Sequence, residues 1–168
     1  MERWDLYDQN RQLTGREIVR GEKIPKGFYH LTIHAWIRNS QGQYLISQRS
    51  ANRPTFPLMW ECVGGSVIKG ENSLHGAIRE IQEEVGLTLS PNDGRMIASV
   101  VGRTVNGVKI PDILDIWLFN YDGPVTLKLA TTHEVAQVSW MTKKRIKYLF
   151  DSGKFVPTLG YFFEMKDF

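Results

Sequence analysis

Three glutamates within one short segment, Glu80, Glu83 and Glu84, have the type and spacing to hold a metal ion. At about 100° per residue of an α-helix, Glu84 lies about 40° to one side of Glu80 and Glu83 about 60° to the other. The three carboxylates therefore share one helix face. Like charges at these spacings destabilise a helix by about 0.2–0.5 kcal/mol per pair, and Arg79, four residues before Glu83, relieves part of this cost. Either this face is solvated, or a hard divalent cation such as Mg²⁺ or Mn²⁺ neutralises it.

The helix that carries these carboxylates is predicted over 73–85. Its apolar residues recur at intervals of 4, 3 and 4 and form one stripe: Leu74, Ile78, Ile81 and Val85. The stripe lies roughly opposite the carboxylates. Gly76, one turn before Glu80, is expected to leave open space over the acidic face, and Gly86 is expected to end the helix as a left-handed cap.

The charges are distributed unevenly along the chain. Residues 71–84 hold four glutamates and one arginine, a net charge of −3, so the remaining residues carry +6 and the total is +3. Such a basic body around a compact acidic segment suits an anionic substrate.

The remaining elements can be predicted from residue patterns. Strands are expected over 4–7, 14–19, 29–37, 43–48, 58–63, 96–103, 110–120 and 135–141, with a basic helix over 142–151 closed by Gly153. Gly64-Gly65 is expected to end the 58–63 strand, with loop over 66–70, and Asn106-Gly107 is typical of a hairpin turn. Residues 1–26 are expected to form a hairpin arm that packs on a single domain over 27–168. Strands interleaved with two separated helices indicate a mixed sheet with helices packed on it.

Length and composition exclude several classes of protein. The chain has 168 residues, of which 42% are hydrophobic and 23% charged, which is typical of one globular domain and not of disordered or fibrous proteins. No run approaches the roughly 18 apolar residues of a membrane span, and no signal peptide is visible at the N-terminus. The single cysteine, Cys62, cannot form an internal disulfide. We therefore expect a cytoplasmic protein without a membrane partner.

A longer motif surrounds the three glutamates. Gly65, Glu71 and the run Arg79-Glu80-Ile81-Gln82-Glu83-Glu84-Val85-Gly86-Leu87 match the Nudix box at every defining position. With average residue usage, chance agreement at nine such positions is about 10⁻⁹ per starting point. The chain thus resembles the Nudix hydrolases over a motif of 23 residues.

This resemblance implies a fold and a metal site. The fold implied is an α/β (α+β) fold, namely an α/β/α sandwich with a mixed sheet, to which the arm adds an N-terminal hairpin. The resemblance also implies that Glu80, Glu83 and Glu84 hold Mg²⁺ or Mn²⁺ beside a diphosphate, and that Arg79 orients them. The backbone carbonyl of Gly64 is expected to complete the coordination. Glu71 is expected to tie its loop to Arg79 or to act as a further ligand.

The rest of the chain is similar, more loosely, to the branch of isopentenyl-diphosphate isomerase. The similarity rests on the order and spacing of a few positions: Thr14-Gly15, His30, Gln48-Arg49, Phe56-Pro57 and Trp60. The positions of Arg49 and Arg53 resemble those of the basic residues that grip the diphosphate in the isomerase.

The sequence departs from the isomerase at the positions of its chemistry. Cys62 comes too early on its strand to match the catalytic cysteine, and residues 19–27 contain no metal histidine. Asp112 and Asp115 do not reproduce the later Glu-x-Glu pair. Hydrolysis is therefore favoured over isomerisation.

The predicted reaction is metal-dependent attack of water on a phosphorus of a small-molecule diphosphate. The general base is either one of the box carboxylates or Glu134, which precedes the last strand. A non-catalytic Nudix-type binding domain is a further alternative. The loops 49–57, 102–109 and 121–133 are expected to select the substrate, whose identity the sequence leaves open.

Other candidate residues receive structural interpretations. His30 and His34 share one face of a strand, where core or rim positions are expected, and Cys62 is expected to be buried. The basic runs lack a nucleic-acid-binding motif, so no specific nucleic-acid partner is expected. The aromatic cluster of residues 161–163 either packs on the core or covers a homodimer interface.

Overall fold

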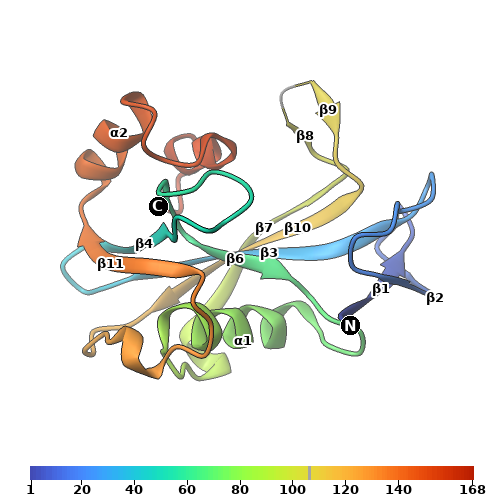
Figure 1. Ribbon diagram of the computed structural model, residues 1–168, viewed down its shortest axis with the longest axis horizontal. Helices are drawn as coiled ribbons and strands as arrows, with labels where there is room; N and C mark the ends of the chain where they lie inside the picture. Colours follow the sequence, from blue (N-terminus) through green and yellow to red (C-terminus); the bar gives the residue numbers. More distant parts are fainter. Residues whose placement is uncertain (106) are drawn as a thin grey trace.

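A computed structural model describes residues 1–105 and 107–168, so Asn106 of the predicted hairpin turn lies outside the described residues. The fold has three layers, with a sheet between two layers of helices (Figure 1). Helix α1 (Ser73–Val85) covers one face of the sheet. Helix α2 (Lys143–Asp151) and the 3₁₀ helix η3 (Pro157–Phe163) cover the other face. This α/β/α sandwich confirms the predicted fold class.

The strands follow the predicted order, except that two short strands replace the predicted 58–63 strand and two more short strands cover residues 104–105 and 108–109. They are β1 (Arg3–Tyr7), β2 (Leu13–Val19), β3 (Tyr29–Arg38), β4 (Tyr44–Arg49), β5 (Trp60–Glu61), β6 (Val63–Ser66), β7 (Gly94–Val101), β8 (Thr104–Val105), β9 (Val108–Lys109), β10 (Asp112–Asn120) and β11 (Val135–Met141). Two short 3₁₀ helices, η1 (Pro91–Asp93) and η2 (Leu127–Leu129), lie in the connections.

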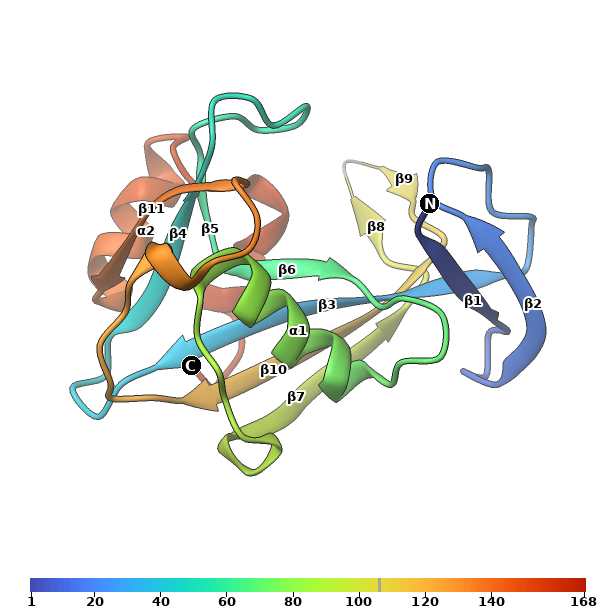
Figure 2. The same ribbon diagram turned by 60° about the horizontal axis from the view of Figure 1, so that its bottom comes forward.

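The sheet is mixed and is organised around the long strand β3. Along one edge, β10 runs parallel to β3 over its whole length, and β7 pairs antiparallel with β10. The other edge of β3 is shared by β1, β6 and β4 in turn. Since β4 pairs with β3 only at their connecting turn, it diverges from β3 and carries β5 and β11, while β6 takes its place beside β3 (Figure 2).

The N-terminal hairpin is part of this sheet and is also anchored at its tip. Strands β1 and β2 pair antiparallel, and Leu6 and Tyr7 of β1 pair with the start of β3. At the tip of the hairpin, Arg11 forms an ion pair with Asp115 of β10, a carboxylate that is fully buried, with Nη2 2.5 Å from Oδ2. The contact joins residues 104 positions apart in the sequence.

Two apolar cores lie on opposite faces of the sheet because side chains alternate along β3 and β10. Ile33, Ala35 and Ile37 pack with α1 on one face, whereas Trp36 packs with α2 and η3 on the other. Phe162 of η3 stacks on Trp36 at a ring-centroid distance of 4.2 Å. The C-terminal aromatic cluster therefore packs on the core, and an additional dimer contact stays a prediction.

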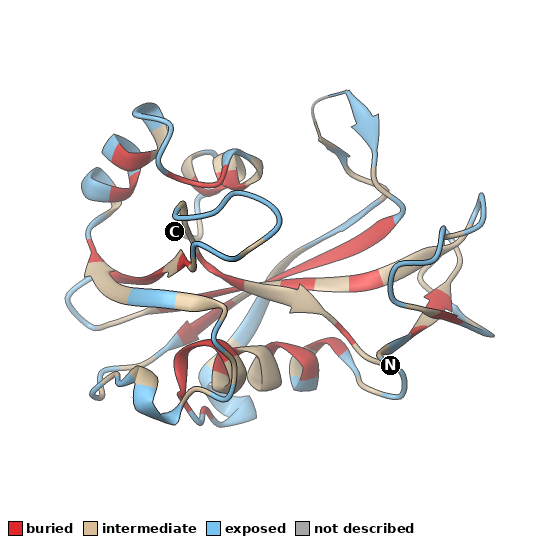
Figure 3. Ribbon diagram, in the orientation of Figure 1, coloured by how far each residue is buried: buried red, intermediate tan, exposed pale blue. Residues whose placement is uncertain are grey.

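Burial is concentrated in the central strands and α1, whereas the β4–β5 loop and the β8–β9 hairpin are largely exposed (Figure 3). None of the helices among residues 1–105 and 107–168 combines the length and hydropathy required to cross a bilayer.

Three local predictions are wrong. The predicted strand over 58–63 is two short strands separated at Cys62, and Gly64-Gly65 lies inside β6 instead of ending a strand. These glycines pair with β3, so the ladder hydrogen bonds outweigh their weak strand propensity. Gly76 has no open space over it, because a Cβ there would lie 2.9 Å from Cγ2 of Val67.

Candidate active site

Helix α1 and strand β6 position the carboxylates of the site. The helix begins where the Asn72 side chain accepts a hydrogen bond from the His75 N–H at 2.9 Å, and Gly86 ends it with φ of 74°, as predicted. Glu80 faces the backbone of β6 so closely that a Cβ on Gly65 would lie 2.2 Å from its Cδ. The glycine in β6 is therefore needed for the carboxylate to lie against the strand.

A pocket of about 240 Å³ contains most of the predicted site residues. Its acidic members are Glu2, Glu80, Glu83, Glu84 and Glu134, its basic members are Arg20, Arg53 and Arg79, and Gly64, Gly65, Ser66 and Thr132 complete the lining. The structure thus brings together the three box glutamates with Arg79, Glu134, Arg53 and Gly64. Arg49 and Glu71 do not line the pocket.

Arg79 connects the loop before α1 with two of the carboxylates. Its Nε donates to Glu71 Oε1 at 2.9 Å, and its Nη1 donates to Glu80 Oε1 at 2.9 Å and to Glu83 Oε2 at 3.0 Å. Its Nη2 also donates to the Ser66 carbonyl at 2.9 Å. Arg79 therefore fixes the relative positions of the box carboxylates, and Glu71 ties its loop to the guanidinium.

The third box glutamate, Glu84, is placed differently from the other two. Its side chain is buried, with 5% of the residue exposed, and its Oε2 has no hydrogen-bond partner among the described residues. Burial raises the pKa of Glu84 well above its usual value, and the nearby Glu61 and Glu80 raise it further. The interpretation of this helix face as a solvated acidic face is therefore wrong.

Burial also raises the pKa of Glu80, to about 7, and Arg79 opposes this rise only in part. An ionised carboxylate in such surroundings is costly unless a cation neutralises it. In the described part of the chain, no three acidic, histidine or cysteine side chains stand arranged to hold an ion directly. Arg79 instead binds oxygens of Glu80 and Glu83.

The donor set nevertheless fits a hard divalent cation. It consists of carboxylate oxygens, which Mg²⁺ and Mn²⁺ prefer, and the Oε2 atom of Glu84 is buried without a partner. A cation would have to take oxygens of Glu80 and Glu83 from Arg79, while Glu84 already offers an unpaired oxygen.

The loop before β11 brings Glu134 to the pocket. The N–H groups of Thr131 and Thr132 donate to the Glu83 carbonyl at 3.0 and 3.1 Å, so this loop is attached to the end of α1. The Glu134 carboxylate is 38% exposed and forms an ion pair with Arg53 Nη1 at 2.5 Å. Glu134 and Arg53 thus line the same pocket as the box carboxylates.

Arg49 binds partners inside the protein and does not line the pocket, whereas the sequence predicted that it contacts the diphosphate. It is buried, its Nη1 donates to Glu61 Oε1 at 2.6 Å, and its Nε donates to the Thr55 carbonyl at 2.9 Å. These contacts direct the guanidinium into the protein and hold the β4–β5 loop. Of the two predicted arginines, only Arg53 reaches the pocket.

Two pocket residues were missed by sequence reasoning because they lie in the N-terminal arm. Arg20 follows β2 and donates from Nη1 to Glu2 Oε2 at 2.8 Å. The other carboxylate oxygen of Glu2 accepts a hydrogen bond from Trp4 Nε1 at 2.7 Å. The sequence marks Arg20 only as one of several basic residues, and no local pattern indicates that the arm reaches the carboxylates.

The histidines and the cysteine have the structural positions expected of them. His30 stacks on Trp4 at 4.3 Å between ring centroids, and His34 Nδ1 lies 2.7 Å from the Tyr161 hydroxyl. Burial lowers the pKa of His34 to about 3, so its ring is neutral. Cys62 is buried, and burial raises the pKa of its thiol well above the usual value.

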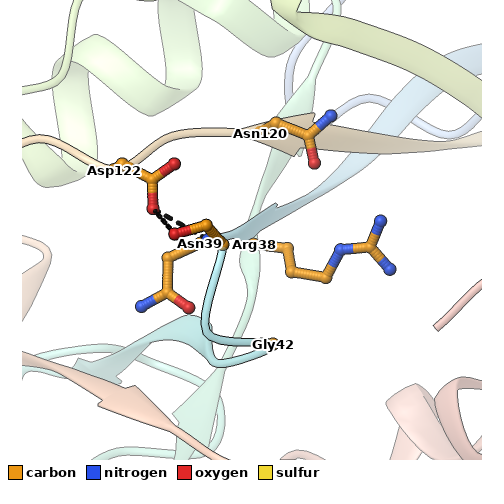
Figure 4. Close-up of a pocket in the computed structure, with 6 residues that line it drawn as sticks. Arg38, Asn39, Gly42, Asn120 and Asp122 are labelled. Atoms are coloured by element: carbon orange, nitrogen blue, oxygen red, sulfur yellow. Dashed lines mark hydrogen bonds between the residues drawn. The ribbon is translucent and has the colours of Figure 1, made fainter.

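A second hollow of about 400 Å³ lies at the β3–β4 turn, at the end of β3 far from the arm. Figure 4 shows Asp122 directed at this turn, where it accepts hydrogen bonds from the N–H and hydroxyl of Ser40 at 2.8 and 2.7 Å, while Arg38 extends away from it. Asp122 thus stabilises the turn, and the lining holds only this one carboxylate.

Comparison with known proteins assigns the family. A model of the NUDIX domain matches residues 28–159. The chain belongs to the Nudix hydrolase family. It is 35% identical over 170 residues to an uncharacterised Nudix hydrolase of Listeria innocua, with 99% of this chain and 96% of that protein covered. It is 37% identical over 164 residues to an uncharacterised Nudix hydrolase of Listeria monocytogenes, with 97% and 91% covered.

A solved structure shares the fold. The structure of a Deinococcus radiodurans protein matches with a TM-score of 0.72 at 23% identity and covers 92% of both chains, a likeness that shows the fold. The family relationship makes the chain an enzyme of the pyrophosphohydrolase type.

The similarity to the isomerase is only partial. The isopentenyl-diphosphate isomerase of Escherichia coli is 30% identical over 63 residues, which is 37% of this chain and 35% of the isomerase. The Nudix resemblance is thus confirmed over the whole domain, and the isomerase resemblance over about a third of the chain.

Proposed function

We propose that this Nudix protein is a divalent-metal-dependent hydrolase that cleaves the diphosphate linkage of a small molecule by attack of water on phosphorus. The observation that carries this proposal is the acidic pocket at α1, in which Glu84 presents a buried oxygen without a partner beside Glu80 and Glu83. Such a site is unfavourable without a cation and favourable with one.

Residues of the Nudix box and the glycine before it would hold the metal. Glu80, Glu83 and Glu84 supply oxygen ligands, and the Gly64 carbonyl completes the set. When bound there, Mg²⁺ or Mn²⁺ supplies positive charge that stabilises the charge developing on phosphate oxygens and lowers the pKa of coordinated water. Arg79 acts as a positioning residue, because its hydrogen bonds to Glu80 and Glu83 set the carboxylate geometry.

The phosphate oxygens of the substrate are bound by Arg53 and Arg20, which both line the pocket. Each guanidinium is paired with a glutamate of the pocket, Arg53 with Glu134 and Arg20 with Glu2. A diphosphate replaces these partly exposed pairs at modest cost, because ion pairs accessible to water contribute only about 0–1 kcal/mol. The bidentate geometry of arginine suits phosphate oxygens.

The proton of the attacking water is accepted by a carboxylate at the pocket. Glu134 is one candidate, since it lines the same pocket and binding of phosphate to Arg53 would free its carboxylate. A box carboxylate is the other candidate. Replacement of each separately distinguishes them: loss of turnover without loss of metal affinity identifies the base.

The test is phosphate release from a panel of diphosphates, comprising nucleoside triphosphates, nucleotide sugars, dinucleotides and simple organic diphosphates, with and without Mg²⁺ or Mn²⁺. The Glu84→Gln variant is expected to lose at least about 100-fold in metal-dependent turnover, whereas Glu164→Gln, an exposed glutamate outside the pocket, serves as the matched control. Near-full turnover by Glu84→Gln would overturn the assignment of the metal site. Metal-dependent ligand binding without turnover of any compound would indicate the non-catalytic alternative.

A further inference from the structure

A mainly apolar cavity of about 430 Å³ lies on the sheet face opposite α1, away from the acidic pocket just described. Its floor is formed by two cross-strand pairs of β7 and β10, Ala98 with Ile116 and Val100 with Leu114. Met165, beyond η3, lines another wall. The described chain therefore offers a hydrocarbon surface large enough to enclose an organic group.

Two of the larger polar side chains that line this cavity make hydrogen bonds within the protein. The Tyr161 hydroxyl accepts from Trp36 Nε1 at 3.0 Å and lies 2.7 Å from His34 Nδ1. Arg103 Nε donates to the buried Asp112 carboxylate at 2.8 Å. A ligand with many donors and acceptors, such as a nucleobase, would leave several of them unpaired there, which weakens binding.

The cavity and the acidic pocket are neighbours of the same intermediate hollow. Gly64 lines the acidic pocket and also a narrow pocket of about 80 Å³ beside His34 and Glu61. Thr158 lines this narrow pocket and also the apolar cavity. The three hollows thus lie next to one another in a series, with the carboxylates at one end and the hydrocarbon surface at the other.

We propose that this series is a single substrate site, in which the acidic pocket holds the diphosphate and the apolar cavity holds an aliphatic organic group attached to it. The proposal rests on the proposed hydrolase function and adds its substrate class. Hydrolysis then breaks the P–O–P bond and adds the oxygen of water to phosphorus, and the products are the organic monophosphate, inorganic phosphate and a released proton. The aliphatic group stays attached to its phosphate and is not altered.

The experiment compares n-alkyl diphosphates whose chains have two to ten carbons. Each methylene that enters an apolar cavity strengthens binding about threefold to fourfold, so kcat/KM is expected to rise by that factor per carbon and then to level off when the cavity is full. A nucleoside diphosphate of similar size is expected to be a poorer substrate than the longer alkyl compounds.

Two variants at lining residues of β7 reduce the volume of the cavity: Ala98→Phe and Val100→Phe. Because Val100 is 42% exposed, the fold tolerates the larger ring more easily there. Both are expected to reduce the ratio of kcat/KM for the eight-carbon over the two-carbon compound at least tenfold. Met96→Phe places the same ring on the same strand outside the cavity and is expected to keep the wild-type ratio.

The outcomes separate this inference from the function on which it rests. If phosphate is released but chain length has no effect, or if both cavity variants keep the wild-type ratio, the substrate class is wrong while the hydrolase function stands. If no compound is hydrolysed, the hydrolase function fails. Binding of the same alkyl series to the Glu84→Gln protein by calorimetry then still decides the inference: affinity that rises with chain length supports it, and affinity independent of chain length overturns it.

Discussion

Replacing Glu80 by glutamine is predicted to reduce the pH dependence of stability in the metal-free protein. Burial against β6 raises the pKa of Glu80 from 4.5 to about 7, and Arg79 opposes this only in part. The folded protein therefore binds the proton more tightly than the unfolded chain. Its contribution to the free energy of unfolding is complete below about pH 4.5 and is lost as the pH rises through about 7.

The size of this effect follows from the pKa change. One pKa unit corresponds to about 1.4 kcal/mol, so the rise from 4.5 to about 7 corresponds to about 3 kcal/mol. Between pH 5 and pH 8, about 2–3 kcal/mol of this contribution is lost. For a protein of this size, such a change lowers the melting temperature by roughly 5–10 °C.

The assay is urea unfolding with a chelator present, at pH 5 and at pH 8, for the wild type, Glu80→Gln and the exposed control Glu164→Gln. The wild type and the control are expected to lose about 2–3 kcal/mol more than Glu80→Gln between the two pH values. The raised pKa values of Glu61 and Glu84 act with the same sign in every protein compared. Because the Glu80 charge is one cause of the raised pKa of Glu84, Glu80→Gln also removes that part of the pH dependence. Equal losses in wild type and Glu80→Gln would refute the reasoning. Adding Mg²⁺ at pH 8 should stabilise the wild type more than the variant.

Three further substitutions test other parts of the structure. Gly65→Ala places a Cβ 2.2 Å from the Glu80 carboxylate carbon, so metal-dependent phosphate release should fall about 100-fold while circular dichroism shows an intact fold; unchanged turnover would contradict the close approach. Arg49→Met leaves the Glu61 carboxylate without its partner and should cost about 3–5 kcal/mol in urea unfolding, of which adding Glu61→Leu should recover a large part; no recovery would mean that the pair does not act as a unit. Phe162→Ala removes a fully buried ring from its stack and should cost about 3–5 kcal/mol; a loss under 1 kcal/mol would show that η3 is not part of the core.

The helix α1 could be predicted to the residue because its signals are local. The apolar stripe, the glutamate positions and Gly86 all lie within the helix or next to it, and the structure gives the predicted bounds and cap. The predicted ion pair of Arg79 with Glu83 is present for the same reason, since its partners are four residues apart.

The end of the 58–63 strand could not be predicted in this way. Gly64-Gly65 has the composition of a strand terminator, but neighbours from elsewhere in the sequence leave little space for a side chain at either position. A Cβ on Gly64 would lie 3.1 Å from the His34 ring, and one on Gly65 would overlap Glu80. The need for glycine is thus set by tertiary packing, which a local pattern does not contain.

Tertiary packing also determines which of Arg49 and Arg53 reaches the pocket. Arg49 ends β4 and Arg53 follows it by four residues, and the sequence does not distinguish their roles. Glu61 on the adjacent strand β5 neutralises one of them inside the protein, and Glu134 holds the other at the pocket rim. Arg20 was missed because only the pairing of the arm with β3 brings it to the pocket.

The ion pair between Arg11 and the buried Asp115 also has a consequence for biosynthesis. The β1–β2 hairpin leaves the ribosome before β10, and its anchor on β10 is made 104 residues later. At roughly 5–20 residues per second, synthesis of that stretch takes about 5–20 s, and an isolated hairpin is only marginally stable in water. We therefore expect the arm to dock late in folding, and Glu2 and Arg20 to reach the carboxylate pocket only once β10 is in place.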